Sequence, residues 1–133
     1  MLGDSTAFAS FSVDDAGSAR TFYEDVLGLE VEEGPMHGIL VLRLGSGAQM
    51  MVYGKGDAHQ PATFTVLHFP VEDVGAAVDA LAARGVTFAR YPDVAHVDER
   101  GVHRFADGAP DIAWFTDPAG NVMALLGAPG MPG

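Results

Sequence analysis

His68 is the side chain in this sequence that is best suited to acid–base chemistry. It lies in the middle of the alternating segment TVLHFPV, residues 65–71. An imidazole donates or accepts hydrogen bonds and exchanges a proton near neutral pH. A structural histidine with satisfied hydrogen bonds is the alternative. No serine and acid are ordered around it, so a catalytic triad is not predicted and the catalytic residues stay unknown.

The segment HVDERGVH places His96 and His103 on either side of Asp98 and Glu99. These side chains are of types that bind metal ions. Their spacing matches no known type of site, and polar loops of this composition are usually solvated. Cysteine is absent, which excludes thiolate nucleophiles, disulfides and cysteine-based zinc sites. A metal site in this loop is therefore an alternative, and we expect no cofactor.

Aromatic and sulfur-containing side chains form a second set of candidates, Phe8, Met51, Tyr53 and Trp114. Three rings and a thioether can make a wall for a planar or cationic ligand. Packing in the core or in a dimer interface is the alternative for the same residues, and the two roles are compatible. The hydroxyl of Ser10 can donate a hydrogen bond to a ligand or be satisfied locally.

These candidates are positioned by an imperfect internal repeat. FSVDDAGSARTFYEDVLG, residues 11–28, resembles FPVEDVGAAVDALAARG, residues 69–85, with matching positions 58 residues apart. Each copy begins with an alternating strand and continues into a helix, capped by Asp15 or Asp73 and ended by Gly28 or Gly85. Three short strands follow. The predicted strands are residues 8–13, 29–33, 39–44 and 49–53, then 65–71, 86–90, 112–116 and 122–126.

The fold class predicted from this order is α+β. Two βαβββ modules, about residues 7–54 and 64–127, form a cupped, mainly antiparallel sheet with helices on the outer face, within a single domain of 133 residues. The hairpin glycines Gly47 and Gly120 are 73 residues apart, so the second module carries about 15 extra residues, near 91–109. We expect this stretch to be a lid, an interface loop or a disordered surface loop.

Period-2 alternation sorts the strand residues into a helix-facing set and an opposite set. The two opposite sets together would line a concave surface that is mostly apolar with a few polar groups, which is typical of a small-molecule pocket. Val66 and Ser12 belong to the same face. The predicted ligand-binding residues are Phe8, Ser10, Met51, Tyr53, His68, Trp114 and Ala124.

The charge balance excludes one class of partner. The sequence has 7 Lys and Arg residues and 18 Asp and Glu residues, which gives a net charge of −11. This charge repels a phosphate backbone, so nucleic acid is not expected as a partner. An acidic surface keeps a protein soluble and can also steer a cationic ligand. No run of eighteen apolar residues predicts a membrane span, and the first residues lack a secretory pattern, so a cytoplasmic protein is expected. The low lysine content indicates a GC-rich bacterial genome.

Three stretches taken together resemble a known family. FSVDDAGSARTFYEDVLGLEV, FPVEDVGAAVDALAARGV and WFTDPAGNVMALL, in this order and spacing, are similar to the vicinal oxygen chelate superfamily of glyoxalases, bleomycin resistance proteins and extradiol dioxygenases. The resemblance covers about residues 8–126 and implies paired βαβββ modules and a homodimer. Its metal-dependent members carry one ligand on each of four strands. The corresponding positions here are Phe8, Met51, Val66 and Ala124, none of which ligates a divalent metal.

The resemblance and the missing ligands favour a metal-free protein that sequesters a small, partly apolar, possibly cationic molecule, as bleomycin resistance proteins do. An enzyme of the glyoxalase or dioxygenase type would need an atypical metal site. A metal-free lyase or isomerase would use His68 as its acid or base. An interaction module without a small ligand is a further alternative.

Overall fold

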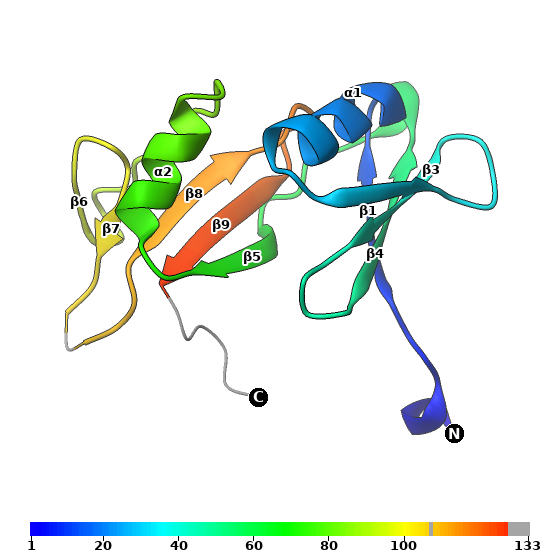
Figure 1. Cartoon of the computed structure of the whole chain (residues 1–133), viewed down its shortest axis with the longest axis horizontal. Coiled ribbons are helices and arrows are strands. Elements are labelled where there is room, and N and C mark those ends of the chain that lie inside the picture. Colours follow the sequence, from blue (N-terminus) through cyan, green and yellow to red (C-terminus); the bar gives the residue numbers. More distant parts are fainter. Residues whose placement is uncertain (107, 128–133) are drawn as a thin grey trace. The chain divides into compact units, whose positions relative to one another are not determined.

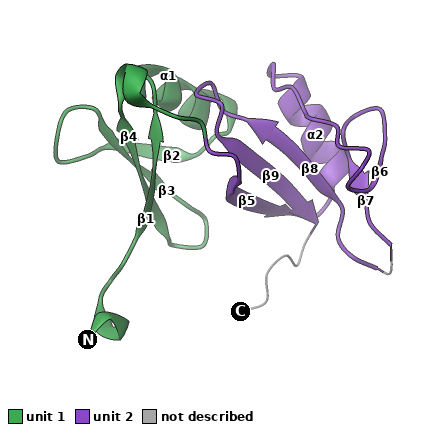
Figure 2. Ribbon diagram, turned by 180° about the vertical axis from the view of Figure 1, so that it is seen from behind, with its two compact units in different colours: residues 1–61 green, residues 62–133 purple. Residues whose placement is uncertain are grey.

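The computed structural model describes residues 1–106 and 108–127. The chain divides into two compact units, residues 1–61 and 62–133, each with one sheet and one α-helix packed on it (Figures 1 and 2). This confirms the α+β class and the repeated module. The single domain and the concave surface shared by both sheets stay predictions.

The first unit is built on a four-stranded sheet in the order β1-β4-β3-β2. Only β1 and β4 run parallel, and the other pairs are antiparallel. Asp15 caps α1 by accepting a hydrogen bond from the backbone N–H of Ser18, and a π-helical turn, Phe22–Val26, extends that helix. The elements are β1 (Ala9–Val13), α1 (Ala16–Thr21), β2 (Glu30–Glu33), β3 (Ile39–Arg43) and β4 (Gln49–Gly54).

The second unit repeats this plan on a five-stranded sheet, in the order β5-β9-β8-β7-β6. Its parallel pair is β5 with β9. Asp73 caps α2 through the backbone N–H of Ala76, 3.0 Å away. The elements are β5 (Thr65–Val71), α2 (Val74–Ala82), β6 (His96–Val97), β7 (His103–Arg104), β8 (Ile112–Thr116) and β9 (Val122–Gly127).

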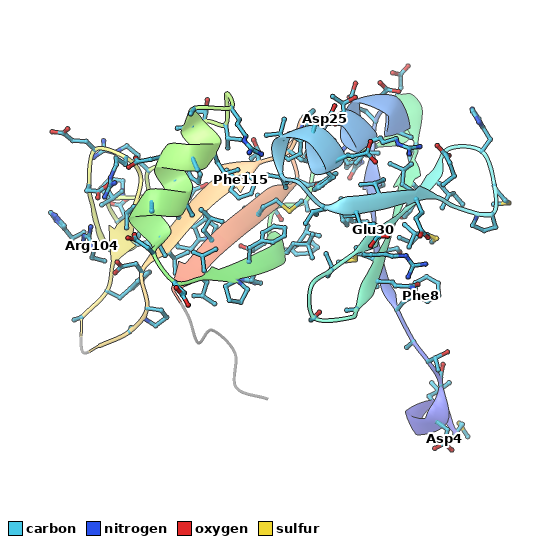
Figure 3. All side chains as sticks on the ribbon, viewed as in Figure 1. Asp4, Phe8, Asp25, Glu30, Arg104 and Phe115 are labelled. Carbon is cyan, nitrogen blue, oxygen red and sulfur yellow. The ribbon has the colours of Figure 1, made fainter. Side chains whose placement is uncertain are left out.

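Burial follows the predicted faces in four of the strands. In β1, β3, β4 and β8 the buried residues alternate with less buried ones, as period-2 patterning requires, whereas β9 buries Met123, Ala124 and Leu125 in succession. Phe11, which packs edge to face against Tyr23, and Val13 are buried in the first core, and Phe115, labelled in Figure 3, is buried in the second. On the opposite face of the second sheet, His68 is exposed and Trp114 is half-buried, but Ala124 between them is buried.

Two predictions about the second unit were wrong. Residues 86–90 do not form a strand: the segment meets β8 only at an isolated bridge between Phe88 and Phe115. The strand beside β8 is instead β7, from the stretch that was expected to be a loop. Both segments lie along the same edge of β8, where Phe88 is opposite Phe115 at one end and His103 is opposite Ile112 at the other. None of the helices in the described ranges is long and apolar enough to cross a bilayer.

Candidate functional site

Four of the seven predicted ligand-binding residues lie in the first unit. Ser10, Met51 and Tyr53 lie on the sheet face away from α1, and Phe8 lies just before β1. Ser10 stands directly opposite Met51, and Ser12 stands opposite Tyr53. Phe8 precedes β1 and is 67% exposed (Figure 3). The structure also joins Ser12 to His59, with Oγ and Nδ1 at 2.8 Å.

The other three lie in one row across the second sheet. His68 on β5 is opposite Ala124 on β9, which is opposite Trp114 on β8. A bulge between Thr65 and Leu67 sets this register. His68 is exposed and Trp114 is half-buried, whereas Ala124 is 0% exposed. The accessible chemistry of this row is thus an imidazole and an indole.

A hollow of about 330 Å³ opens beside Trp114. Phe64 and Val94, 68% and 56% exposed, offer apolar surface at its edge. Of its lining, only Trp114 is among the predicted ligand-binding residues. Phe64, Tyr91 and Val94 lie outside regular strands and give no periodic signal, whereas Thr65 and Val122 begin strands β5 and β9 and could have been found from the alternation. The lining is Thr63, Phe64, Thr65, Tyr91, Val94, Trp114 and Val122, without a charged side chain.

The indole of Trp114 is held in a defined orientation. Its Nε1–H donates a hydrogen bond to Oγ1 of Thr65 at 3.2 Å. Its ring packs edge to face against Tyr91, with centroids 5.6 Å apart, and against His103, with centroids 4.8 Å apart. Because Thr65 accepts from the indole, its own hydroxyl proton remains able to point toward a ligand.

His103 lies behind this aromatic wall and is fully buried. Its Nε2 accepts a hydrogen bond from the backbone N–H of Tyr91 at 2.9 Å. Its Nδ1 lies 2.9 Å from the carbonyl oxygen of Gly101, which can only accept. The geometry assigns the neutral tautomer with the proton on Nδ1. Both ring nitrogens are therefore used by the backbone, and His103 is not free to ligate the metal ion considered for HVDERGVH.

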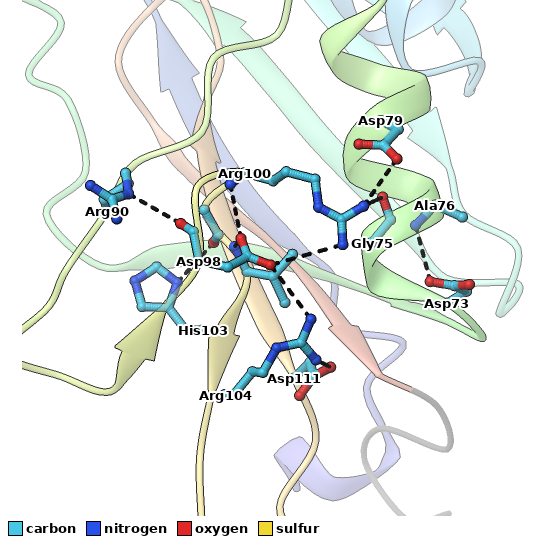
Figure 4. A network of polar contacts seen from close by, with 12 residues as sticks. Asp73, Gly75, Ala76, Asp79, Arg90, Asp98, Arg100, His103, Arg104 and Asp111 are labelled. Atoms are coloured by element: carbon cyan, nitrogen blue, oxygen red, sulfur yellow. Dashed lines mark hydrogen bonds and ion pairs between the residues drawn. The ribbon is translucent and has the colours of Figure 1, made fainter.

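The turn that carries Gly101 is stabilised by charge. Asp98 accepts hydrogen bonds from the backbone N–H groups of Arg100 and Val102, at 2.9 and 3.0 Å (Figure 4). Its other oxygen lies 3.8 and 3.5 Å from the guanidinium nitrogens of Arg100 and Arg104. Burial raises the pKa of this carboxyl, but the two N–H donors and then the two guanidinium groups outweigh it. The net result is a pKa for Asp98 below the ordinary 3.8.

The network reaches two other elements of the unit. Arg100 donates to Asp79 on α2 at 3.0 Å, and Arg104 donates to Asp111, next to β8, at 3.0 Å (Figure 4). On the other side of the turn, Nε of Arg90 donates to the backbone oxygen of Asp98 at 3.2 Å. These exposed pairs each contribute little energy, but together they tie the hairpin β6–β7 to its surroundings.

A family model confirms the resemblance found in the sequence. Residues 6–125 match the glyoxalase/bleomycin resistance protein/dioxygenase superfamily. The chain belongs to this superfamily. Comparison with functionally curated proteins finds no match.

Several solved structures share the fold of this chain. A glyoxalase/bleomycin resistance protein from Catenulispora acidiphila is 25% identical, with a TM-score of 0.64 over 92% of this chain and 97% of that one. The fosfomycin resistance protein FosX from Listeria monocytogenes has a TM-score of 0.70 at 14% identity, over 94% and 93%. TnmS3, an antibiotic-binding protein from Streptomyces sp. CB03234, has a TM-score of 0.64 at 22% identity, over 93% and 97%.

The donor set expected of a metal-dependent member of the superfamily does not fit here. Phe8, Met51, Val66 and Ala124 offer aromatic, thioether and aliphatic groups in place of imidazole and carboxylate. His68, rather than Val66, faces Ala124, which leaves one imidazole without a second donor across from it. Within residues 1–106 and 108–127, no three histidine, aspartate or glutamate side chains gather in a way that could hold a metal ion.

Proposed function

We propose that this chain binds a small, flat, partly apolar molecule in the hollow beside Trp114 and acts by sequestering it, without a metal ion. The observation that carries the proposal is the orientation of the indole, which Thr65 and Tyr91 hold with one ring edge fixed. A rigid aromatic wall binds a flat ligand at a small entropic cost. Exposed apolar surface of Phe64 and Val94 at the edge adds area to bury.

A cationic ligand is favoured over an anionic one. The hollow has no charged side chain to neutralise an anion, and the net charge of −11 raises the concentration of cations near the surface. An aromatic ring also attracts a cation placed over its face. Four of the arginines are already paired with carboxylates, which lowers their ability to attract an anion.

The relatives support binding without establishing a ligand. One similar structure is described as an antibiotic-binding protein and another as a fosfomycin resistance protein. We propose in addition that the protein is bacterial, is located in the cytoplasm and forms a homodimer. Sedimentation equilibrium tests the dimer, since a monomer has a mass of 13.9 kDa.

The test is equilibrium dialysis with N-methylquinolinium, a flat cation, and with 1-methylnaphthalene, its neutral counterpart. We expect both to bind and the cation to bind more tightly at low ionic strength. Trp114→Ala should weaken binding by more than about 1 kcal/mol, whereas Trp114→Phe should lose less because a ring remains. Tyr53→Ala is the matched control, because it removes an aromatic ring from the first unit and leaves the hollow beside Trp114 as it is. Undiminished binding by Trp114→Ala would move the site away from the hollow.

One observation favours a second candidate. His68 is an exposed imidazole in the same row as Trp114, where it could transfer a proton to or from a bound molecule. This is the metal-free lyase or isomerase considered from the sequence. Fosfomycin, followed by phosphorus NMR, is a suitable probe. Its conversion by the native chain and not by His68→Gln would replace sequestration with catalysis.

A further inference from the structure

We propose that His103 is the positioning residue of the aromatic hollow, and that the hollow keeps its shape only while this imidazole is neutral. The inference rests on the proposed function for the ligand, but its first test requires no ligand. His103 is fully buried and touches both ring walls, with centroids 5.7 Å from Tyr91 and 4.8 Å from Trp114. No sequence motif assigns it this role.

The two hydrogen bonds of His103 define which protonation state fits. Nε2 must accept, because its partner is the backbone N–H of Tyr91. Nδ1 must donate, because its partner is the carbonyl of Gly101. A second proton on the ring would set one N–H donor against another at a distance of 2.9 Å. The bond would be lost, and a positive charge would remain on a side chain that has no exposed surface.

The loss of that bond would act directly on the hollow. Tyr91 is joined to the imidazole through its own backbone, and its ring packs against the indole of Trp114. The preceding Ala89 is the last residue of this segment that hydrogen-bonds to β8, through the carbonyl of Trp114 at 2.9 Å. At Tyr91 itself, the carbonyl accepts a hydrogen bond from the N–H of Val94 in the same loop at 2.9 Å, and the N–H bonds to His103 on β7. The bond to His103 therefore ties Tyr91 to the sheet, and its loss would loosen one wall of the hollow.

The charged groups around His103 do not provide a counterion for an imidazolium. On the turn, Asp98 is already occupied by two backbone N–H groups, Arg100 and Arg104. On the β8 side, Asp111 is paired with Arg104. Arg90, next to Tyr91, is itself positive, as is His96 on β6 when protonated. Both hydrogen bonds of His103 go to backbone groups within the described residues.

The first experiment uses the free protein, because Trp114 is its only tryptophan and reports on the hollow directly. Fluorescence is recorded from about pH 8 to about pH 5, the range in which histidines change charge. We expect a reversible shift of the emission in the native chain that His103→Gln abolishes. Gln can place an acceptor near the position of Nε2 without titrating.

Two matched variants separate His103 from the other imidazoles. His68→Gln removes the histidine in the row of Trp114, and His96→Gln removes the one on the neighbouring strand β6. Both should keep the pH-dependent shift. Coincident curves for the native chain and His103→Gln, including two flat ones, would overturn the proposal.

Nitrogen NMR of the native protein gives a readout that does not depend on a variant that folds. Nδ1 of His103 should carry the proton at about pH 8. A proton on Nε2 instead would overturn the assignment. His103→Asn, which keeps a donor toward Gly101 only, should lose more thermal stability than His103→Gln if the bond to Tyr91 matters most.

Binding of N-methylquinolinium then links the switch to the ligand. Its affinity for the native chain should fall by about tenfold between about pH 8 and about pH 5, while that for His103→Gln should change much less. A pH-dependent Trp114 signal without binding at any pH would defeat the proposed function and leave the role of His103 intact. Binding of N-methylquinolinium with identical pH profiles in the native chain and in His103→Gln would support the proposed function and overturn the role of His103.

Discussion

Asp117 and Asn121 bind each other across the tight turn of the last hairpin. Oδ1 of Asp117 accepts a hydrogen bond from the backbone N–H of Asn121 at 2.8 Å, and Oδ2 accepts one from its side-chain amide at 3.2 Å. Asp117 also accepts from the backbone N–H of Ala119, and Asn121 accepts from that of Ala62. Both side chains are buried, so the DPAGN turn is held by its own polar groups rather than by solvent.

Replacing Asp117 should therefore be costly. Asp117→Ala leaves two buried backbone N–H groups without this acceptor, and we expect a loss of about 3 kcal/mol in the free energy of unfolding. Urea unfolding measures it. Asp57→Ala, at an exposed aspartate, is the control and should change stability by less than about 0.5 kcal/mol. Equal losses in the two variants would mean that the turn does not depend on Asp117.

Alanine substitutions at Gly101 and Gly85 together measure the cost of placing a Cβ close to the neighbouring segment at Gly101. Their φ angles are +95° and +93°, so Ala at either is strained by the backbone, at about 1–2 kcal/mol. A Cβ on Gly101 would also lie 2.9 Å from Cβ of Phe88 and 3.2 Å from the carbonyl of Ala89, whereas one on Gly85 would meet nothing within 4 Å.

Gly101→Ala should thus lose about 1–2 kcal/mol more than Gly85→Ala in the free energy of unfolding. Because the Gly101 carbonyl also holds His103, only this variant should alter the fluorescence of Trp114. Thermal and urea unfolding of both proteins, with emission spectra, check the expectation. Indistinguishable variants would show that the crowding at Gly101 is relieved without cost.

The lowered pKa of Asp98 predicts part of the loss of folding stability in acid. Its pKa in the folded chain lies below the ordinary 3.8, despite burial, because of the backbone N–H donors of Val102 and Arg100 and the two guanidinium groups. The stabilisation is therefore complete above about pH 4 and is lost as the pH falls through the lower folded value. Asp98→Asn should be less stable than the native chain near neutral pH, and the difference should shrink on acidification. A difference that grows with acid would contradict the assignment.

Metal addition should leave the protein unchanged. The positions that the sequence resemblance assigns to metal ligands carry Phe8, Met51, Val66 and Ala124, so we expect no stoichiometric retention of Zn²⁺, Ni²⁺, Mn²⁺ or Fe²⁺ after desalting, and no rise in Tm. Elemental analysis measures retention. One equivalent of metal that disappears in His68→Gln would instead place a site on the row across β5, β9 and β8.

Much of the fold could be predicted because the signals are local. Strict alternation placed Ser10 with Met51 and His68 with Trp114 on the open faces, and the register bears out both faces. Asp15 and Asp73 were predicted as helix caps, and each accepts the expected hydrogen bond. In these elements a few neighbouring residues decide the conformation.

The errors lie where distant residues decide. Residues 86–90 alternate like a strand, but they pair with β8 only at Phe88, and β7 pairs with the other end of the same edge. His103 sits in a polar stretch that predicts exposure, yet it is fully buried because Tyr91 and Trp114 close over it. Burial of this kind depends on packing partners 11 and 12 positions away, and no short window of sequence contains it.

The two units show what became of the internal repeat. Ser10, Met51 and Val41 form a row across the first sheet, and His68, Ala124 and Trp114 form the same row across the second. The backbone was duplicated, but the chemistry on it diverged. The stretch from Tyr91 to β7, which the first unit lacks, supplies one wall of the hollow and the imidazole behind it. Ligand preference can therefore evolve within that stretch while the strand pairing inherited by both copies stays intact.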